Sequence, residues 1–500
     1  MGIETHNQQR IHTYFFPFMA HGHMLPIVDM ANLFASRGQH TTIVTTPLNA
    51  PEFSHTIQRT QVCGTKIDVK TIKFPSVEAG LPEGCENLDG VKSKDMMDKF
   101  IKAIRLLQQP LEQLPREHCP DCLVADIFFP WATDVANKFG IPRLLFHGTS
   151  FFSLCASECI RLYEPHKKLS SDYEPFVIPN FPDSIELTRA KLPEYLRCDN
   201  ETDLTKLICD SKESELRSYG IIVNSFYELE PAYADHYRNV LKRRAWHIGP
   251  VSLCNRDIED KAKRGKKPAI DEHECLKWLD SKEPNSVIYI SFGSIARFNS
   301  SQLREIALAL VASGHQFVWV IRRLEDEKDE EGFLPDGFEK RMEGKGLIIR
   351  EWAPQLLILD HRAVGAFLTH CGWNSTLEGI CAGVPMVTWP VAAEQFYNEK
   401  FITHVLRTGV RVGARRWVGF QEGGGCDVGK EAIKKAICEV MEGEGAESIR
   451  NKAKALAAMA RKAIEEGGSS YCDLNALIEE FGALKAAREA RKDPSVECAK

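Results

Sequence analysis

The chain contains 500 residues, of which 43% are hydrophobic and 26% are charged, and its formal net charge is −6. This length exceeds one typical hydrophobic core and predicts two domains, while the composition excludes a disordered protein. The mild acidity argues against a nucleic-acid partner, because such partners are bound by clustered Lys and Arg.

The N-terminus and the apolar runs predict a cytoplasmic protein without a membrane partner. Residues Met1 to Arg10 are polar and lack the apolar core of a secretory signal, and no apolar run is long enough to span a bilayer. The 16 cysteines are scattered without a secretory context, which indicates reduced thiols.

The chain opens with a strand, a helix and a second strand. Ile11 to Met19 is an apolar strand, Pro26 has the fixed φ that suits the first turn of a helix, and Gly38 suits its C-terminal cap. His40 to Thr46 is then a second strand. The intervening turn has no G-x-G-x-x-G pattern, which argues against a nicotinamide or flavin oxidoreductase.

This first turn carries two histidines, His21 and His23, near the expected start of the helix. The helix dipole there disfavours the imidazolium and keeps the ring available as a base. A later strand, Cys122 to Asp126, delivers a carboxylate at its own carboxyl end. An aspartate in that place can accept a hydrogen bond from imidazole Nδ1–H and stabilise the imidazolium that forms when the other nitrogen takes a proton.

The rest of the first half predicts further strands and an irregular segment. Arg143 to Phe146 is a strand followed by a loop that contains Thr149, and Tyr219 to Asn224 is another strand. Between them, Leu154 to Tyr219 is interrupted by prolines, which we interpret as a loop-rich region lining an acceptor site.

A basic run at residues 261–267 follows several acidic residues and predicts a solvated linker. We therefore expect a first domain at residues 1–253, a linker at 254–272, a second domain at 273–481 and a charged tail at 482–500. The second domain opens with the strand Ser286 to Phe292, then Gly293-Ser294, then a helix from Ser301 to Ser313.

The stretch from Trp352 to Gln395 has the parts of a nucleotide site. Val364 to Leu368 suits a buried parallel strand, and Thr369 to Thr376 leads into a helix that we expect to be capped by Asn or Ser. The free backbone N–H groups and positive dipole end of such a helix favour a phosphate or pyrophosphate.

Other side chains of this stretch suit a sugar nucleotide. Trp352 offers a flat face for a base, and stacking of this kind contributes about 1 to 3 kcal/mol per base. Gln355 and Glu378 can bind the vicinal hydroxyls of a ribose, and Glu394 and Gln395 can bind a hexose.

Two motifs resemble the plant family-1 UDP-glycosyltransferases. The donor stretch matches from Trp352-Ala353-Pro354-Gln355 through His370-Cys371-Gly372-Trp373-Asn374-Ser375 to the closing Gln395. Gly22-His23-x-x-Pro26 is similar to the family's N-terminal motif, and Asp126 falls at the family's aspartate position. The resemblance implies the α/β GT-B fold, with two facing Rossmann-like domains, parallel sheets and a C-terminal segment, Ser470 to Phe481, that crosses back to the first domain.

The resemblance also implies a role for each motif residue. Trp352 would stack on uracil while the backbone of Ala353 pairs with its edge, and Gln355 and Glu378 would hold the ribose. The diphosphate would be bound by Ser294, His370, Asn374 and Ser375, and the sugar by Thr149, Trp373, Glu394 and Gln395. A closing Gln is the family's usual mark of glucose, whereas Glu394 departs from the more common Asp.

The implied reaction is inverting transfer of glucose from UDP-glucose to a hydroxyl of a small lipophilic plant metabolite. His23 would be the base and Asp126 its partner, with His21 as the rival base. No metal or cofactor is expected, and the enzyme is expected to be a monomer. A phenolic acceptor, either a coumarin such as scopoletin or a flavonoid, is preferred over a triterpenoid; a non-catalytic UDP-sugar-binding protein is the alternative of a different class.

Overall fold

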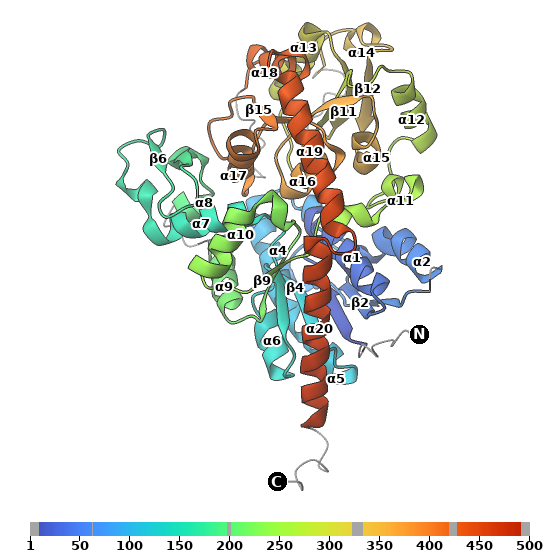
Figure 1. The fold of residues 1–500 in the computed structure, drawn as a ribbon, viewed down its shortest axis with the longest axis vertical. Helices are drawn as coiled ribbons and strands as arrows, with labels where there is room; N and C mark the ends of the chain where they lie inside the picture. Colours follow the sequence, from blue (N-terminus) through green and yellow to red (C-terminus); the bar gives the residue numbers. More distant parts are fainter. Residues whose placement is uncertain (1–9, 63, 198–201, 323–333, 420–427, 492–500) are drawn as a thin grey trace.

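Two parallel sheets, each covered by helices, form the two halves of the molecule (Figure 1). The computed structural model describes residues 10–62, 64–197, 202–322, 334–419 and 428–491. Among these residues, no helix has the length and apolar character needed to cross a bilayer. The helices are α1 (His21–Ser36), α2 (Ser54–Val62), α3 (Ser76–Ala79), α4 (Lys94–Leu106), α5 (Gln108–Glu117), α6 (Ala132–Lys138), α7 (Phe151–Tyr163), α8 (Glu194–Arg197), α9 (Asp203–Leu216), α10 (Pro231–Asp235), α11 (Ile258–Ala262), α12 (Glu272–Asp280), α13 (Ser300–Ser313), α14 (Phe338–Arg341), α15 (Gln355–Leu359), α16 (Trp373–Ala382), α17 (Gln395–Lys400), α18 (Lys430–Glu442), α19 (Ala446–Ile464) and α20 (Ser469–Ala490).

The first sheet has the strand order β3-β2-β1-β4-β5-β8-β9, with every pair parallel. The order reverses between β1 and β4, so the loops after these two strands diverge and leave a crevice at their carboxyl ends. The strands are β1 (His12–Phe16), β2 (His40–Thr45), β3 (Ile67–Thr71), β4 (Cys122–Asp126), β5 (Arg143–Phe146), β8 (Gly220–Val223) and β9 (Ala245–His247).

The second sheet has the order β12-β11-β10-β13-β14-β15, again parallel throughout, and reverses between β10 and β13. Both central strands are buried along their whole length, as their continuous apolar sequences predict. The strands are β10 (Val287–Ser291), β11 (Gln316–Ile321), β12 (Gly346–Arg350), β13 (Val364–Thr369), β14 (Met386–Thr388) and β15 (Gly409–Arg411); a separate antiparallel pair is formed by β6 (Pro175–Val177) and β7 (Glu186–Thr188).

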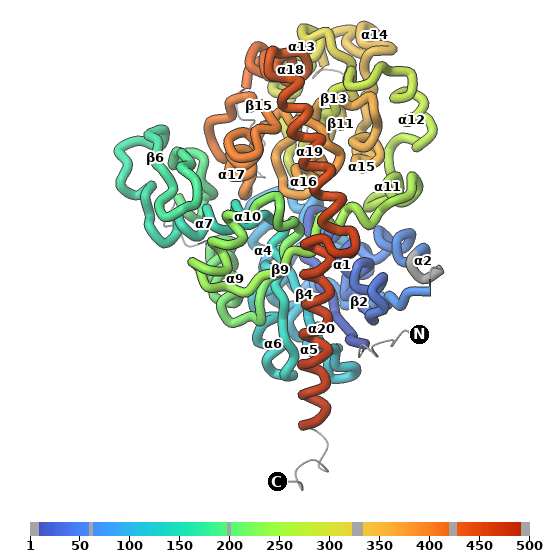
Figure 2. The backbone as a smooth tube through the Cα atoms, in the orientation of Figure 1, coloured from blue at the N-terminus to red at the C-terminus, as the bar shows by residue number. Residues whose placement is uncertain are grey.

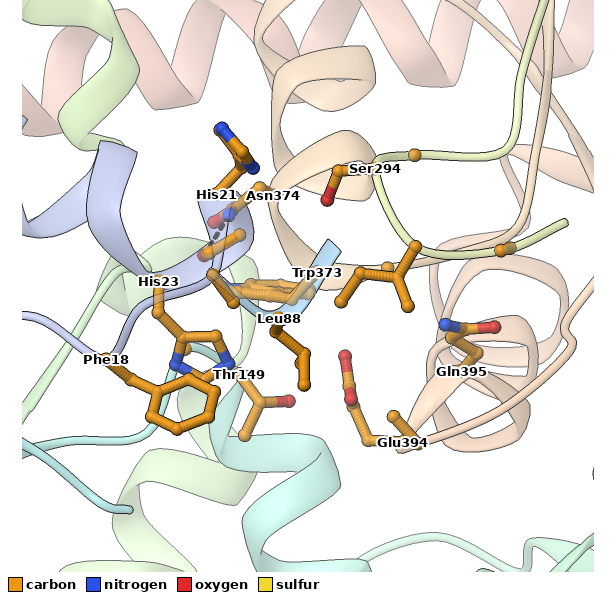
Figure 3. A pocket seen from close by; sticks show the side chains of 18 of the residues that line it. Phe18, His21, His23, Leu88, Thr149, Ser294, Trp373, Asn374, Glu394 and Gln395 are labelled. Carbon is orange, nitrogen blue, oxygen red and sulfur yellow. Dashed lines mark hydrogen bonds between the residues drawn. The ribbon is translucent and has the colours of Figure 1, made fainter. Parts of the chain in front are cut away.

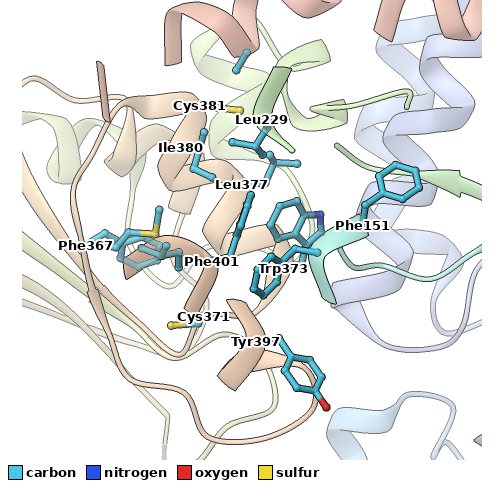
Figure 4. Close-up of a cluster of buried hydrophobic side chains, with 14 of the residues drawn as sticks. Phe151, Leu229, Phe367, Cys371, Trp373, Leu377, Ile380, Cys381, Tyr397 and Phe401 are labelled. Atoms are coloured by element: carbon cyan, nitrogen blue, oxygen red, sulfur yellow. The ribbon is translucent and has the colours of Figure 1, made fainter. Parts of the chain in front are cut away.

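The two halves share a hydrophobic core (Figure 4). Phe151 and Leu229 of the first half belong to the same buried cluster as Trp373 and Phe401 of the second. The indole N–H of Trp373 donates a 2.7 Å hydrogen bond to the backbone oxygen of Asn224. This packing brings the carboxyl ends of both sheets to one cleft.

The C-terminal helices join the halves a second time. Figure 2 shows the chain passing from α19 beside the second half to α20 along the first. The expected return of Ser470 to Phe481 is thus observed, and α20 packs against β9. Within the expected charged tail, residues 482–490 continue α20, and Lys485 and Arg488 both form ion pairs with Asp121. Residues 492–500 lie outside the described part.

Three local expectations were wrong. Helix α1 begins at His21 rather than at Pro26, which is its sixth residue. Pro26 has no N–H for the carbonyl of Gly22 four residues earlier, and that carbonyl accepts a hydrogen bond from Asn374 instead. The segment from Leu154 to Tyr219 contains most of α7 and all of α9, because the prolines fall between these helices. Helix α16 is capped by Gly372 without a side-chain cap, which places Asn374 and Ser375 in its first turn.

The linker is only partly solvated, contrary to the sequence-based expectation. Lys263 is about half exposed, but Arg264 is only 9% exposed and forms ion pairs with Asp29 and Glu378. A run of basic residues therefore contains one that belongs to the interior.

Candidate active site

One cavity of about 860 Å³ lies between the two sheets, and residues of both halves and the linker line it (Figure 3). All the predicted site residues line it except Asp126, which lies beneath His23. The lining residues predicted from the sequence are His23, Thr149, Ser294, Trp352, Ala353, Gln355, His370, Trp373, Asn374, Ser375, Glu378, Glu394 and Gln395.

His23 and Asp126 meet where the first sheet reverses its strand order. His23 is in the first turn of α1, directly after β1, and Asp126 is the last residue of the neighbouring strand β4. Nδ1 of His23 is 2.7 Å from Oδ2 of Asp126, and the backbone N–H of Phe128 donates a 3.1 Å hydrogen bond to Oδ1. Asp126 is fully buried, so its carboxylate holds the imidazole in one orientation and leaves Nε2 for a substrate.

The surroundings of His23 set its basicity. Burial by itself would disfavour the imidazolium, but the charge of Asp126 and its hydrogen bond outweigh burial and raise the pKa of His23 above 6.5. Phe18 and Phe128 lie at ring-centroid distances of 5.5 Å on the apolar side of the imidazole. The site is thus a base with a fixed tautomer beside an apolar surface.

His21 is placed differently, although it is on the same helical turn. Its Nε2 lies 2.9 Å from an oxygen of Glu52 but outside hydrogen-bond geometry, and its ring is 5.2 Å from that of Trp352. The side chain is 2% exposed. His21 therefore lies at the end of the cleft that contains Trp352, away from the pair formed by His23 and Asp126.

Glu394 and Gln395, two of the expected sugar-binding residues, lie across the pocket from His23 (Figure 3). The side-chain oxygen of Gln395 accepts hydrogen bonds from the backbone N–H groups of Val391 and Ala392, at 2.8 and 2.9 Å, which leaves its NH₂ group as a donor. Burial raises the pKa of Glu394, whose carboxylate accepts a 3.1 Å hydrogen bond from Asn398.

Two other predicted sugar contacts differ in what they can offer. The hydroxyl of Thr149 is buried without a hydrogen-bond partner, so it is free to bind a sugar hydroxyl. Trp373, in contrast, has already donated its indole N–H to Asn224 and its backbone N–H to Glu394, so only its ring remains for a sugar.

The expected diphosphate site lies where the second sheet reverses. Ser294 follows β10, and His370 follows β13 immediately before α16. Burial and the nearby charge of Arg322 lower the pKa of His370 to about 4, so its ring is neutral. The buried Nδ1 of the same ring has no hydrogen-bond partner. Gly293, at φ 75°, passes so close that a Cβ there would lie 2.6 Å from the ring of His370.

Helix α16 contributes to this site from its first turn. The side-chain NH₂ of Asn374 donates a 2.5 Å hydrogen bond to the backbone oxygen of Gly22, next to His23, while its buried Oδ1 has no partner. The NH₂ group of Gln355 donates to Ser375 Oγ at 3.1 Å and to Glu378 Oε2 at 2.7 Å. The expected ribose and diphosphate residues are thus joined in one network.

Trp352 is partly exposed and lines the cleft, as a stacking platform must. The guanidinium carbon of Arg322 lies 5.2 Å from the centre of its ring, and Arg322 Nη1 donates a 2.8 Å hydrogen bond to the backbone oxygen of Ser294. Next to Trp352, Ala353 is 9% exposed, and its carbonyl accepts a 2.9 Å hydrogen bond from the N–H of Gln355.

Two arginines that line the cleft, Arg264 and Arg322, were not predicted from the sequence. Arg322 directly follows β11, so the rule that ligands bind at the carboxyl ends of parallel strands could have identified it. Arg264 had no such signal, because it contacts residues far away in the sequence.

The expectation that no metal is needed stays a prediction. Within the described ranges, one group of three possible metal ligands, His315, Cys438 and Glu442, has its ligand atoms within 4.8 Å of one another. None of the three lines the cleft.

Comparisons with known proteins agree with this arrangement. The family model described as "UDP-glucoronosyl and UDP-glucosyl transferase" matches residues 93–416. The chain is 58% identical to scopoletin glucosyltransferase of Nicotiana tabacum over 94% of this chain and 98% of the relative. It is 56% identical to UDP-glucose flavonoid 3-O-glucosyltransferase 7 of Fragaria ananassa, over 97% and 99%.

A solved structure, Glycyrrhiza uralensis UGT73P12 complexed with glycyrrhetinic acid 3-O-monoglucuronide, superposes with a TM-score of 0.91 at 41% identity. The match covers 97% of this chain and 98% of that one. Together with the two parallel sheets, it confirms the GT-B fold expected from the sequence. The chain belongs to the family of UDP-glucuronosyl and UDP-glucosyl transferases.

Proposed function

We propose that this enzyme transfers glucose from UDP-glucose to a hydroxyl of a small lipophilic acceptor, with inversion at the anomeric carbon, to give a β-glucoside. The observation that carries the proposal is the 2.7 Å contact between His23 and Asp126 at the wall of a cavity that also contains the complete donor motif. A protein that only binds UDP-sugars has no use for an oriented base at that place.

In the proposed reaction, Nε2 of His23 takes the acceptor's hydroxyl proton while the acceptor oxygen attacks the anomeric carbon. The bond from that carbon to the phosphate oxygen breaks, and its electron pair leaves with UDP. Asp126 stabilises the imidazolium that forms and keeps the tautomer correct, without taking the proton itself.

Protein groups stabilise the departing diphosphate in this proposal. Ser294, the neutral His370 and the first turn of α16 supply hydrogen-bond donors at one place, where negative charge develops. We propose on this basis that no metal ion or cofactor takes part.

Glucose is the proposed sugar because Gln395 presents its NH₂ group beside Glu394, opposite the base. Thr149 would add a hydroxyl contact on the side of His23. UDP would occupy the other end, with uracil on Trp352 and the ribose at Gln355 and Glu378.

The acceptor is proposed to be a phenol of the coumarin or flavonoid type. Phe18 and Phe128 lie beside the ring of His23, further apolar side chains line the same cavity, and the two relatives above carry scopoletin and flavonoid in their names. A phenol, for which tyrosine with a pKa of about 10 is a guide, also loses its proton to a moderate base more easily than an alcohol. The apolar residues are Phe18, Phe100, Ile101, Ile104, Phe128, Leu204, Leu207 and Ile208.

A triterpenoid is the second candidate acceptor. It is favoured by the solved Glycyrrhiza structure, which contains glycyrrhetinic acid 3-O-monoglucuronide. A phenol and a triterpenoid differ in size, so turnover measured with each class of acceptor can distinguish the two candidates.

The test is UDP release by the purified protein with UDP-glucose and a panel of scopoletin, flavonols and triterpenoid aglycones. We expect release that depends on a phenolic acceptor and continues in EDTA, and a product whose anomeric proton shows the coupling of a β-glucoside. An α-glucoside, or no turnover with any acceptor although UDP-glucose binds, would contradict the proposal. Light scattering tests the accompanying proposal that the enzyme is a monomer. A fluorescent fusion of the enzyme tests the proposed cytoplasmic location.

A further inference from the structure

Arg264 of the linker lies at the centre of a buried charge network. Its Nε and Nη2 donate hydrogen bonds of 3.0 and 2.8 Å to Oδ2 of Asp29, and its Nη1 donates one of 2.8 Å to Oε1 of Glu378. The three side chains are 9%, 2% and 5% exposed, respectively. Asp29 belongs to α1, the helix that carries His23, and Glu378 belongs to α16, so one guanidinium connects both halves through the linker.

The charges and the geometry of this network suit an arginine at its centre. Burial by itself would disfavour the charge of Arg264, but the carboxylates of Asp29 and Glu378 outweigh it and raise the pKa of the guanidinium. The fork of donors on an arginine can hold two carboxylates at once, whereas the ammonium of a lysine is a single point charge. The other oxygen of Asp29 accepts a 3.0 Å hydrogen bond from Asn255, so this anchor is itself held in place.

Glu378 is one of the two residues proposed to bind the ribose. Its Oε1 is held by Arg264, and its Oε2 accepts a 2.7 Å hydrogen bond from Gln355. A carboxylate oxygen has two lone pairs, so each oxygen keeps one for a ribose hydroxyl. Arg264 therefore holds the carboxylate of Glu378 in one orientation without occupying all of its acceptor sites.

The linker also touches the residue proposed to stack on uracil. A Cβ at Gly265, whose φ is 87°, would lie 2.7 Å from Cζ2 of Trp352, so only glycine allows the chain to pass there. The N–H of Ala269 donates a 2.8 Å hydrogen bond to the carbonyl of Trp352. The linker thus contacts both the base platform and the ribose carboxylate.

We infer that Arg264 is a positioning residue for the donor: it orients Glu378 toward the ribose hydroxyls and ties that orientation to α1. This inference rests on the proposed use of a UDP-sugar. Loss of Arg264 should weaken recognition of the ribose much more than it slows glucose transfer, since the residue does not reach the reacting atoms.

The experiment compares Arg264→Met with Lys263→Gln, a matched change of a half-exposed linker cation that does not line the cleft. We expect KM for UDP-glucose to rise about 10- to 100-fold in the first variant, the range for a lost charge-assisted hydrogen bond, with kcat changed less than about threefold. The control should match the wild type. Arg264→Lys should fall between them, because a lysine cannot hold both carboxylates in the same way.

A second comparison separates positioning from folding. Removal of Arg264 leaves both Asp29 and Glu378 buried without their cation, so the double variant Arg264→Met/Asp29→Asn should recover part of the lost thermal stability but not donor affinity. The donor analogue that lacks the ribose 2′-hydroxyl should be disfavoured by the wild type and much less so by both variants.

Recovery of donor affinity in the double variant, or an unchanged penalty for the 2′-deoxy donor in Arg264→Met, would overturn the inference. These results are distinguishable from failure of the proposed function. In that case the wild type itself would neither bind UDP in calorimetry nor release it from UDP-glucose.

Discussion

At the end of the cleft that contains His23, the proposed catalytic base and its partner come from two neighbouring strands of one sheet. At the other end, the proposed ribose-binding residues are held by contacts from both halves and the linker. His23 and Asp126 need only β1 and β4 to meet. Glu378 needs Gln355 from α15, Arg264 from the linker and, through Arg264, Asp29 from α1. The base can thus be assembled by the first half alone, but the donor site is complete only when the halves are packed together.

The difference predicts that substitutions at the two ends change different kinetic constants. The largest effect is expected at the base: His23→Ala should lower kcat about 10²- to 10⁴-fold, the usual contribution of a general base. UDP should bind it with the affinity of the wild type, as measured by calorimetry.

His21→Ala is the matched control for that variant, since it removes a second imidazole from the same helical turn. Because His21 lies near Trp352, its loss should act on donor binding and leave kcat within about tenfold of the wild type. A larger loss of kcat in His21→Ala than in His23→Ala would reverse the assignment of the base.

A smaller effect of a different kind is expected at the nucleotide end. Trp352→Ala removes the proposed stacking surface, which should weaken UDP binding by about 1 to 3 kcal/mol. Calorimetric titration with UDP measures this directly. Unchanged affinity would show that uracil does not stack on Trp352.

The smallest effect is expected outside the cleft, where Arg488 of α20 pairs with the buried carboxylate of Asp121. Arg488→Ala should lower the free energy of unfolding by about 1 kcal/mol or less, because Arg488 is partly exposed and Lys485 also reaches Asp121. Urea denaturation measures the change, and kcat and KM should match the wild type. A change in KM would mean that the C-terminal helix also shapes the donor site.

The two ends also differed in how far the sequence predicted them. Strand β4 was predicted with its observed bounds and β13 to within one residue, because continuous apolar runs mark buried parallel strands. Residues at the carboxyl ends of these strands, such as Asp126 and His370, follow from that pattern. The start of α1 could not be predicted in this way, because the fixed φ of Pro26 suits both the first turn of a helix and an early interior position.

Contacts made across the cleft were beyond local reasoning. Arg264 lies in a basic run that is typical of a solvated surface, and only the packing of the two halves brings it to Asp29 and Glu378, which are 235 and 114 residues away. The same holds for Asn374, whose amide contacts Gly22. Hydrophobic periodicity and capping patterns predict single helices and strands, and they do not predict contacts between residues that are far apart in the sequence.

The most direct test of the central claim, that Asp126 makes His23 an oriented base, is the pH dependence of kcat. Only neutral His23 can take the acceptor's proton, and Asp126 raises its pKa. For an acceptor that does not ionise in this range, kcat should rise with pH and level off above an inflection higher than 6.5. In Asp126→Asn, kcat should be lower throughout and the inflection should move to lower pH, because the raising charge is gone. A flat profile in the wild type, or an inflection that stays in place in Asp126→Asn, would contradict the claim.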